Sequence, residues 1–348
     1  MVRRLLFASV AFAPVVILVH YVLEPSETLE FVLAAAALIP LAWLIGEATE
    51  HAAEHTGPGI GGFLNATFGN APELIIALFA VNAMDFEVVR GSLTGSVVGN
   101  LLLVLGFSLL FGGRGEIDRK SSFISLGLVA FTILLLLITS VPGWDGDPER
   151  DLIVYLSIPV SIVLLVVYVG STWYSLRRHA ALHTAGNGDT GDTGGWSLRL
   201  ALVVLGFATV ITALVAEILV GSINSFATDS GVSEFFLAAV VIAIVGNAAE
   251  HGGAVVVAHR GKIKLAAEIA LSSSAQVAVF LIPAVALLAL LIEPLALAFR
   301  QVEIAALAVS VLITSILLAD GRSSRLKGVL MIVAYVGIAF AFFVAGER

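Results

Sequence analysis

Long apolar segments follow one another along almost the whole chain and limit its possible folds more than any other feature. About eleven runs of roughly 20 mostly apolar residues alternate with short polar stretches, and each run is long enough to cross a bilayer as a helix. Apolar residues make up 59% of the chain, against roughly 45–50% in soluble proteins. The sequence therefore predicts an all-α integral membrane protein with about eleven transmembrane helices.

The predicted spans are approximately 5–23, 29–54, 61–81, 88–111, 123–141, 152–173, 198–226, 235–258, 265–291, 296–318 and 326–345. The first span follows Arg3 and Arg4 but lacks a small-residue cleavage site, so we expect a retained helix rather than a signal peptide. The net charge of −8 argues against a nucleic-acid partner, and the lack of Cys excludes disulfides and thiolate metal sites.

The basic residues predict the orientation of the chain. An N-terminus in the cytoplasm leaves Arg90, Arg150, Arg300 and Arg348 outside and places every other Lys and Arg inside. Loops on the cytoplasmic side of membrane proteins carry such an excess of Lys and Arg. We therefore expect a cytoplasmic N-terminus and an extracytoplasmic C-terminus.

A polar stretch divides the chain into two halves of similar length. Residues 177–197 contain AGNGDTGDTGG, which has no apolar periodicity and indicates a flexible cytoplasmic linker. The predicted organisation is an N-terminal transmembrane helix (1–27), a first five-helix repeat (28–176), this linker and a second five-helix repeat (198–348).

A short motif recurs in the two halves. Gly69 to Glu73 reads GNAPE, and Gly246 to Glu250 reads GNAAE. Each is followed in the next span by an amide among small residues, Asn100 in the first copy and Gln276 in the second. Five spans separate the two motifs, so the copies have opposite orientations in the membrane. Inverted repeats with a midplane binding site are typical of secondary transporters.

Glu73 and Glu250 lie inside apolar spans without an adjacent Lys or Arg. A charge at bilayer depth costs at least about 2.5–3.5 kcal/mol, so each carboxyl group is expected either to carry a proton or to bind a cation. Oxygen ligands suit Ca²⁺. Further oxygen donors are expected from Asn70, Asn247, Asn100, Gln276, Ser96, Ser272 and Ser273. Gly-Asn, with Pro72 in the first copy, also predicts helix breaks that expose backbone carbonyl groups.

The second span ends in Glu47, Glu50, His51, Glu54 and His55, which helical spacing places mostly on one face. Three interpretations remain open. The cluster is a solvated helix end, a cation-attracting mouth or proton relay, or, because HAAEH fits H-x-x-E-H, the zinc site of an intramembrane metalloprotease formed by His51, Glu54 and His55.

Four other ionisable residues have weaker signals. Glu217 is expected either to line the pathway or to be structural. His251 is expected to adjust the proton affinity of Glu250 or to hydrogen-bond a neighbouring helix. Glu268 is expected to pair with Lys264 four residues earlier, and Glu303 to be a solvated residue at an outer helix end.

The chain resembles the calcium/cation:proton antiporter family, within the cation/calcium exchanger superfamily. The resemblance is sharpest in TGPGIGGFLNATFGNAPELIIALFAV, SLTGSVVGNLLLVLG and GNAAEHGGAVVVAHRGKIKLAAEIALSSSAQVAVFLIP. It implies that Glu73 and Glu250 are the central cation and proton ligands, that the Asn, Gln and Ser residues above line the site, and that the second and seventh spans are moving gates. It also implies a prokaryotic-type exchanger, because the long N-terminal tail of plant and fungal members is absent.

The expected function is therefore exchange of Ca²⁺ for H⁺ by alternating access, without a resident cofactor. The alternatives are a Na⁺/Ca²⁺ exchanger of the same superfamily and the metalloprotease. The expected partners are the transported ions, the lipid bilayer of a prokaryotic cell membrane and a second copy of the chain in a homo-oligomer.

Overall fold

The computed structural model describes residues 7, 9–23, 25–183 and 195–346 of the chain. Within these residues the fold is helical, apart from turns, irregular connections such as residues 294–300 and one two-stranded antiparallel sheet. The elements of the first half are α2 (Phe12–Leu23), α3 (Glu27–Phe68), α4 (Ala71–Asn82), α5 (Phe86–Val98), the π-helix η1 (Gly99–Val104), α6 (Leu105–Gly112), β1 (Gly115–Glu116), α7 (Arg119–Gly143) and α8 (Asp151–His183).

The second half repeats this order of long and interrupted helices. Its elements are α9 (Leu198–Ser230), α10 (Glu234–Phe236), η2 (Leu237–Ile242), α11 (Ala243–Gly246), α12 (Ala248–His259), α13 (Ile263–Gln276), η3 (Val277–Leu281), α14 (Ile282–Ala289), α15 (Gln301–Leu318), β2 (Arg322–Ser323) and α16 (Arg325–Ala345).

The apolar runs form helices of membrane-spanning length, as predicted. In the described part of the chain, 8 helices are long and apolar enough to span a bilayer, and a ninth span arises if a pair bent by 58° is counted as one. The first predicted span is the shorter helix α2, and the third comprises the end of α3 followed by α4. Each predicted run thus corresponds to a helix or to consecutive helices.

The predicted linker is partly helical. Helix α8 continues to His183, so residues 177–183 extend it, while 184–194 lie outside the described residues. Helix α9 then begins after Ser197, whose side chain accepts a hydrogen bond from the Leu200 amide, and ends at Gly231 with φ of 68°. A serine N-cap and a left-handed terminal glycine are the usual boundaries of a helix.

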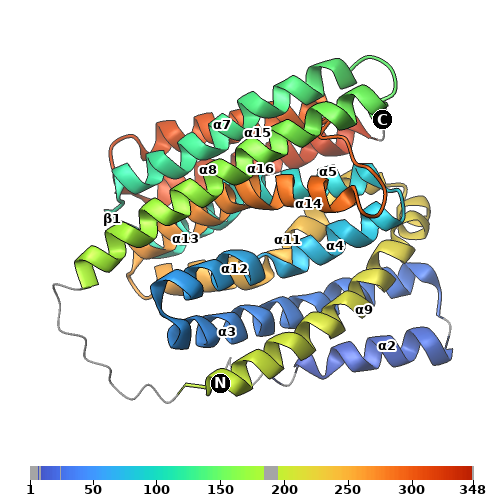
Figure 1. The fold of residues 1–348 in the computed structure, drawn as a ribbon, viewed down its shortest axis with the longest axis horizontal. Helices are drawn as coiled ribbons and strands as arrows, with labels where there is room; N and C mark the ends of the chain where they lie inside the picture. Colours follow the sequence, from blue (N-terminus) through green and yellow to red (C-terminus); the bar gives the residue numbers. More distant parts are fainter. Residues whose placement is uncertain (1–6, 8, 24, 184–194, 347–348) are drawn as a thin grey trace.

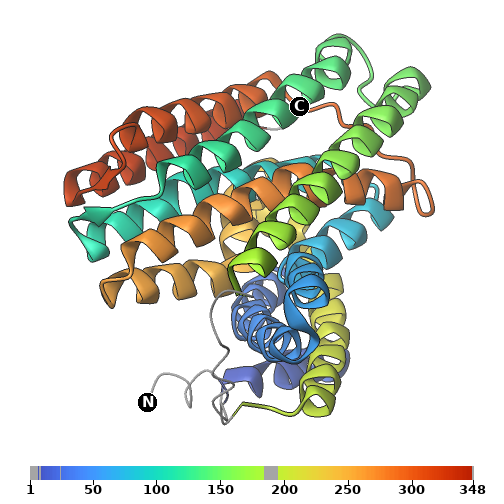
Figure 2. The ribbon, with the colours of Figure 1, turned by 60° about the vertical axis from the view of Figure 1, so that its left-hand side comes forward.

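Helices α2, α3 and α9 form a bundle beside the rest of the molecule, which Figure 2 shows in its lower part. The remaining helices enclose α5 and α13, the most deeply buried pair of interrupted helices. The turn from α4 to α5 and the turn from α12 to α13 lie at opposite ends of the molecule (Figure 1). The two motif-bearing copies therefore have opposite orientations, as the repeat predicted.

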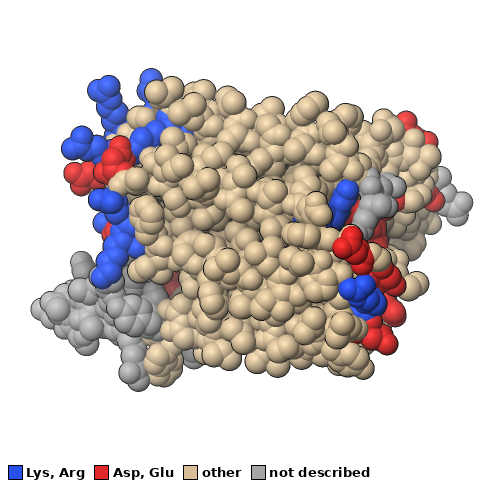
Figure 3. Space-filling view, turned by 90° about the horizontal axis from the view of Figure 1, so that it is seen from above, with Lys and Arg blue, Asp and Glu red and all other residues tan. Residues whose placement is uncertain are grey.

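Strands β1 and β2 join two loops that are far apart in the sequence. Gly115 pairs with Ser323 and Glu116 with Arg322 in antiparallel register. The Ser323 hydroxyl donates hydrogen bonds to the carbonyl oxygens of Gly113 (2.8 Å) and Gly115 (3.2 Å). Basic side chains gather at this end and acidic ones mainly at the other, with an uncharged belt between them (Figure 3).

Candidate functional site

Both copies of the repeated motif lie at helix breaks. Gly69 and Asn70 form the turn between α3 and α4, and Asn247 separates α11 from α12. The backbone of Asn70 has φ −101° and ψ 16°, and that of Asn247 has φ −86° and ψ 10°, so neither residue continues a helix. The break predicted from Gly-Asn and Pro72 is therefore confirmed, while the carbonyl oxygens of Asn70 and Asn247 accept hydrogen bonds from the Leu74 and His251 amides, each at 3.0 Å.

The Asn247 side chain reaches from the second repeat into the first. Its Nδ2 donates to Ser96 Oγ at 2.8 Å, and its Oδ1 accepts from Asn100 Nδ2 at 3.3 Å. Ser96 lies on α5, and Asn100 lies in η1, directly after α5. All three side chains are at most 2% exposed, so this polar cluster is buried.

Ser273 connects the same cluster to Glu250. Asn100 Nδ2 donates to Ser273 Oγ at 2.9 Å, and the Ser273 hydroxyl donates to Glu250 Oε2. Ser96 and Ser273 occupy equivalent places in the two repeats, because each follows the motif glutamate at the same spacing. Both serines hydrogen-bond the second motif, Ser96 through Asn247 and Ser273 through Glu250.

The first motif reaches across to the second repeat in the same way. Asn70 Nδ2 donates to Gln276 Oε1 at 3.4 Å. Gln276 is the last residue of α13, where the helix passes into η3, just as Asn100 lies where α5 passes into η1. Such π-helical segments often occur at functional sites, because the altered helical register changes where nearby side chains point.

Glu73 packs against the backbone of the second motif. A Cβ atom placed on Gly246 would lie 3.2 Å from Glu73 Cγ and 3.5 Å from its Cδ. The Glu250 carboxylate also acts on Glu73 electrostatically. The sequence singled out Gly246 only as part of the motif, and nothing in it showed that this glycine makes room for the glutamate of the other copy.

Two buried oxygen atoms at the site have no hydrogen-bond donor among the described residues. They are Glu73 Oε2 and Asn100 Oδ1. Buried polar atoms in native proteins nearly always have a partner, so these two oxygens are available to accept one. Carboxylate and amide oxygens are ligands for a hard cation, and a carboxylate oxygen also accepts a proton.

Other predicted site residues lie outside this hydrogen-bonded cluster, among them Ser272, Glu217 and His251. The Ser272 hydroxyl donates to the Ile269 carbonyl of its own helix at 3.1 Å. Glu217 is exposed along α9. His251 follows Glu250, and its Nε2 is buried without a hydrogen-bond partner in the described part of the chain.

The acidic and histidine residues of the second span lie along α3. His51 lies between Glu47, 3.6 Å away, and Glu54, 3.2 Å away, whereas His55 Nε2 donates to the Trp196 carbonyl at 2.7 Å. Glu50 is exposed. The two histidines have different partners, and no three His, Asp or Glu residues in the described ranges are placed to share a metal ion. The zinc site required by the metalloprotease alternative is therefore not formed.

Two expectations for other charged residues were wrong. Glu303 is not solvated but fully buried, where it accepts hydrogen bonds from Thr94 Oγ1 (3.0 Å) and the Arg300 amide (2.7 Å). Lys264 does not pair with Glu268 but lies 3.5 Å from Asp118, the residue that caps α7. In both cases the side chain contacts a residue distant in sequence, Thr94 for Glu303 and Asp118 for Lys264, which the local sequence does not indicate.

Arg90, which the sequence predicts on the outside and within the span 88–111, lies in α5 and is 3% exposed. Its guanidinium donates to Glu149 and, at 3.2 Å, to the Ala296 carbonyl. Arg90 therefore holds the N-terminal part of α5 to the two connecting segments that contain Glu149 and Ala296.

The family model of the sodium/calcium exchanger protein matches residues 26–177 and 200–344 of the chain. Each matched segment contains one copy of the motif and one break at that motif.

Curated relatives match almost the whole chain. The Ca²⁺/H⁺ antiporter of Aphanothece halophytica is 35% identical over 98% of this chain and 96% of its own length. The Ca²⁺/H⁺ antiporter ChaA of Bacillus subtilis (strain 168) is 36% identical over 97% of both chains. The crystal structure of the Ca²⁺/H⁺ antiporter protein YfkE superposes with a TM-score of 0.83 at 33% identity and covers 98% of this chain and 99% of that one.

Proposed function

The chain belongs to the calcium/cation:proton antiporter family, within the cation/calcium exchanger superfamily, and on this premise we propose that it exchanges Ca²⁺ for H⁺ across a membrane. It is an integral, multi-pass membrane protein and a transporter rather than an enzyme. The family relationship supports this choice over the metalloprotease. The two histidines of the metalloprotease alternative also have different partners, since His51 contacts Glu54 and His55 contacts the Trp196 carbonyl.

In the proposed mechanism Glu73 and Glu250 hold either a dehydrated Ca²⁺ or protons, and never both. The observation that carries this assignment is the pair of buried, unpaired oxygens, Glu73 Oε2 and Asn100 Oδ1. Asn70, Asn247, Gln276 and Ser96 complete the polar surroundings, and Ser273 orients the Glu250 carboxylate. Each loaded state cancels buried negative charge, whereas the empty, fully ionised site is costly at bilayer depth. Because the empty transporter therefore rarely switches between its two states, movement of Ca²⁺ in one direction requires movement of H⁺ in the other.

Alternating access is assigned to movement of α3 and α9 relative to the remaining helices. These two helices pack on one another and, with α2, form the bundle of Figure 2. At one end they are joined by hydrogen bonds from Ser225 to Glu27 and from Thr28 to Asp229. These contacts support the proposal that α3 and α9 move together as one rigid body. The proposed division of the chain is an N-terminal transmembrane helix (1–27), a first repeat (28–176), a linker (177–197) and a second repeat (198–348).

The proposed orientation places β1, β2 and the basic end in the cytoplasm and the C-terminal, acidic end outside. The separation of basic from acidic side chains along the molecule supports it (Figure 3). In a bacterial cell membrane this arrangement would use the inward proton gradient to extrude Ca²⁺.

Purified protein in liposomes tests the proposal. An imposed pH gradient is expected to drive ⁴⁵Ca²⁺ uptake, and Glu73→Gln and Glu250→Gln are each expected to abolish it, because a glutamine keeps the shape but neither ionises nor releases a proton. Glu268→Gln is the matched control, since Glu268 is exposed and lies outside the polar cluster. Its uptake should equal that of the parent.

Two results would overturn parts of the proposal. Uptake that requires Na⁺ and ignores the pH gradient would identify a Na⁺/Ca²⁺ exchanger. Uptake retained in both glutamine variants would exclude Glu73 and Glu250 as the ligands while leaving the exchange itself intact.

A further inference from the structure

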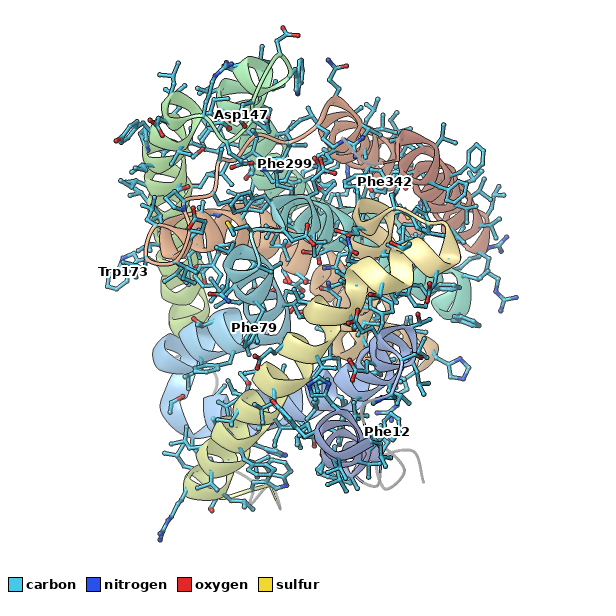
Figure 4. All side chains as sticks on the ribbon, turned by 90° about the vertical axis from the view of Figure 1, so that its right-hand side faces the viewer. Phe12, Phe79, Asp147, Trp173, Phe299 and Phe342 are labelled. Carbon is cyan, nitrogen blue, oxygen red and sulfur yellow. The ribbon has the colours of Figure 1, made fainter. Side chains whose placement is uncertain are left out.

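The basic end of the molecule concentrates positive charge on three neighbouring connections, which join α6 to α7, α12 to α13 and α15 to α16. The first two pack together, since a Cβ atom on Gly115 would lie 2.3 Å from Ile263 Cγ2. The basic residues of these connections and of the helix starts that follow them are Arg114, Arg119, Lys120, Arg260, Lys262, Lys264, Arg322, Arg325 and Lys327. The opposite end, which faces the viewer in Figure 4 with Asp147 labelled, is mainly acidic.

The acidic residues near these bases neutralise only part of their charge. Lys264 lies 3.5 Å from Asp118, and Lys327 lies 2.5 Å from Asp320. Glu116, the third acid of these connections, is exposed and stands opposite Arg322 in the β1–β2 register. The bases other than Lys264 and Lys327 form no ion pair with any residue that the structure describes. Positive charge at this end therefore exceeds what the three acids neutralise.

Four exposed arginines form one group across the β1–β2 pair, and we call them the arginine cluster: Arg114, Arg119, Arg322 and Arg325. The stem of Arg119, from the first half of the chain, lies against Gly321 of the second, where an added Cβ atom would be 2.7 Å from Arg119 Cγ. Arg325 of the second half lies beside Gly113 of the first, where the corresponding distance to its Nε is 3.7 Å. Both glycines have a positive φ, 72° at Gly113 and 70° at Gly321, which other residues rarely adopt. The backbone turns thus hold arginines from both halves together.

An exposed apolar stripe runs along α16 from the arginine cluster. Leu326, Val329 and Val333 are 68%, 42% and 62% exposed, and their spacing places them on one face of the helix. Leu326 directly follows Arg325, so the stripe begins beside the guanidinium groups. In a bilayer such a face contacts acyl chains, while basic side chains at the helix end extend to the lipid headgroups. A ligand that suits both features combines an anionic group with hydrocarbon chains.

We propose that the arginine cluster binds the phosphate group of an anionic phospholipid, with an acyl chain along the apolar stripe of α16. Arginine suits this ligand because its planar guanidinium group donates parallel hydrogen bonds to phosphate oxygens. The surplus positive charge favours a headgroup with net negative charge over a zwitterionic one, which brings a cation of its own.

The proposed lipid connects the two halves of the chain, because the arginines that bind its phosphate come from both sides of the β1–β2 pair. None of these arginines belongs to the cation site. The proposal therefore does not depend on which ions the protein exchanges.

Native mass spectrometry of the purified protein in a neutral detergent tests the lipid specificity. Phosphatidylglycerol and phosphatidylcholine with the same acyl chains are titrated separately, and the first is expected to bind roughly tenfold more tightly and to raise the unfolding temperature. Glycerophosphoglycerol, the same headgroup without acyl chains, and inorganic phosphate are expected to do neither at the same concentrations. Equal binding of the two lipids, or of phosphatidylglycerol and its free headgroup, would overturn the proposal.

Glutamine variants identify the groups responsible. Arg322→Gln and Arg325→Gln are each expected to weaken phosphatidylglycerol binding about fivefold, the contribution of one basic side chain near an anionic headgroup. Arg199→Gln is the matched control, since it removes an exposed arginine at the start of α9, outside the cluster, and should leave the binding unchanged.

The unfolding temperature without added lipid shows whether each variant folds, and all three are expected to match the parent because these arginines are exposed. Unchanged binding in both cluster variants, or an equal loss in Arg199→Gln, would overturn the site. Because the measurement requires no transport, its outcome is independent of the glutamine variants at Glu73 and Glu250.

Discussion

The side chain of Glu73 in the first repeat lies against Gly246 of the second, where an added Cβ atom would stand 3.2 Å from Glu73 Cγ. The two halves thus meet through the glutamate of one motif and the glycine of the other. The position of the Glu73 side chain depends on this contact. A larger residue in place of Gly246 would push that side chain away by a few tenths of an ångström. The glycine is consequently a determinant of where the carboxylate stands.

Gly246→Ala is expected to weaken Ca²⁺ uptake because the methyl group displaces the Glu73 carboxylate. The apparent affinity for Ca²⁺ should fall about tenfold, equivalent to about 1.4 kcal/mol, in the liposome uptake assay. Gly127→Ala on α7 is the matched control, since a Cβ atom there meets nothing within 4 Å. Equal affinities for the two variants would contradict the packing role of Gly246.

Ser273→Ala is expected to impair transport far more than Ser272→Ala. The first change removes the donor to Glu250 and the acceptor for Asn100, whereas the second removes a bond within one helix. Hydrogen bonds to charged groups contribute about 1.5–3 kcal/mol, so Ser273→Ala should lower the apparent Ca²⁺ affinity roughly 10- to 100-fold. Ca²⁺ titration of uptake would measure both variants, and similar losses in the two would exclude a special role for Ser273.

Arg90→Met is expected to destabilise the fold. It removes the ion pair with Glu149 and leaves the Ala296 carbonyl without this donor. Loss of one member of a buried charge pair costs about 3–5 kcal/mol, which SDS-induced unfolding in mixed micelles would measure. Arg150→Met removes hydrogen bonds to loop carbonyls at the same end and should cost much less. A destabilisation no larger than that of Arg150→Met would show that Arg90 is dispensable.

Trp196→Ala is expected to loosen the start of α9. The Trp196 ring lies 5.1 Å from His51 and 6.0 Å from Phe7 between ring centroids, and its loss removes both contacts. A local destabilisation of about 1 kcal/mol would accelerate tryptic cleavage after Arg199 about fivefold. Trp173→Ala is the control, because Trp173 is 59% exposed on α8. Unchanged cleavage would show that other contacts hold this segment.

The main elements of the site follow from short-range signals in the sequence. Gly-Asn followed by Pro72 disfavours a continuous helix, and the structure breaks the helix there. A repeated carboxylate with repeated amides indicated one composite site, and Asn70, Asn247 and Asn100 indeed hydrogen-bond across the repeats. These features were predictable because the symmetry of the duplication relates distant residues.

Features without such symmetry were not predictable. The burial of Glu303 depends on Thr94, 209 positions away, and no residue near Glu303 indicates that partner. Lys264 and Glu268 have the helical spacing of an ion pair, yet Lys264 pairs with Asp118, the N-cap residue of α7. The π-helical segments beside Asn100 and Gln276 likewise have no simple pattern of residue types, because tertiary packing sets the helical register.

The short pairing of β1 with β2 has a consequence for biogenesis. It joins residues 208 positions apart, so it closes only after the helices of both halves have been inserted. Until then the backbone of both loops is open to proteases on that side of the membrane. Protection of residues 113–117 during synthesis would therefore report completed assembly of the two halves, before any ion is transported.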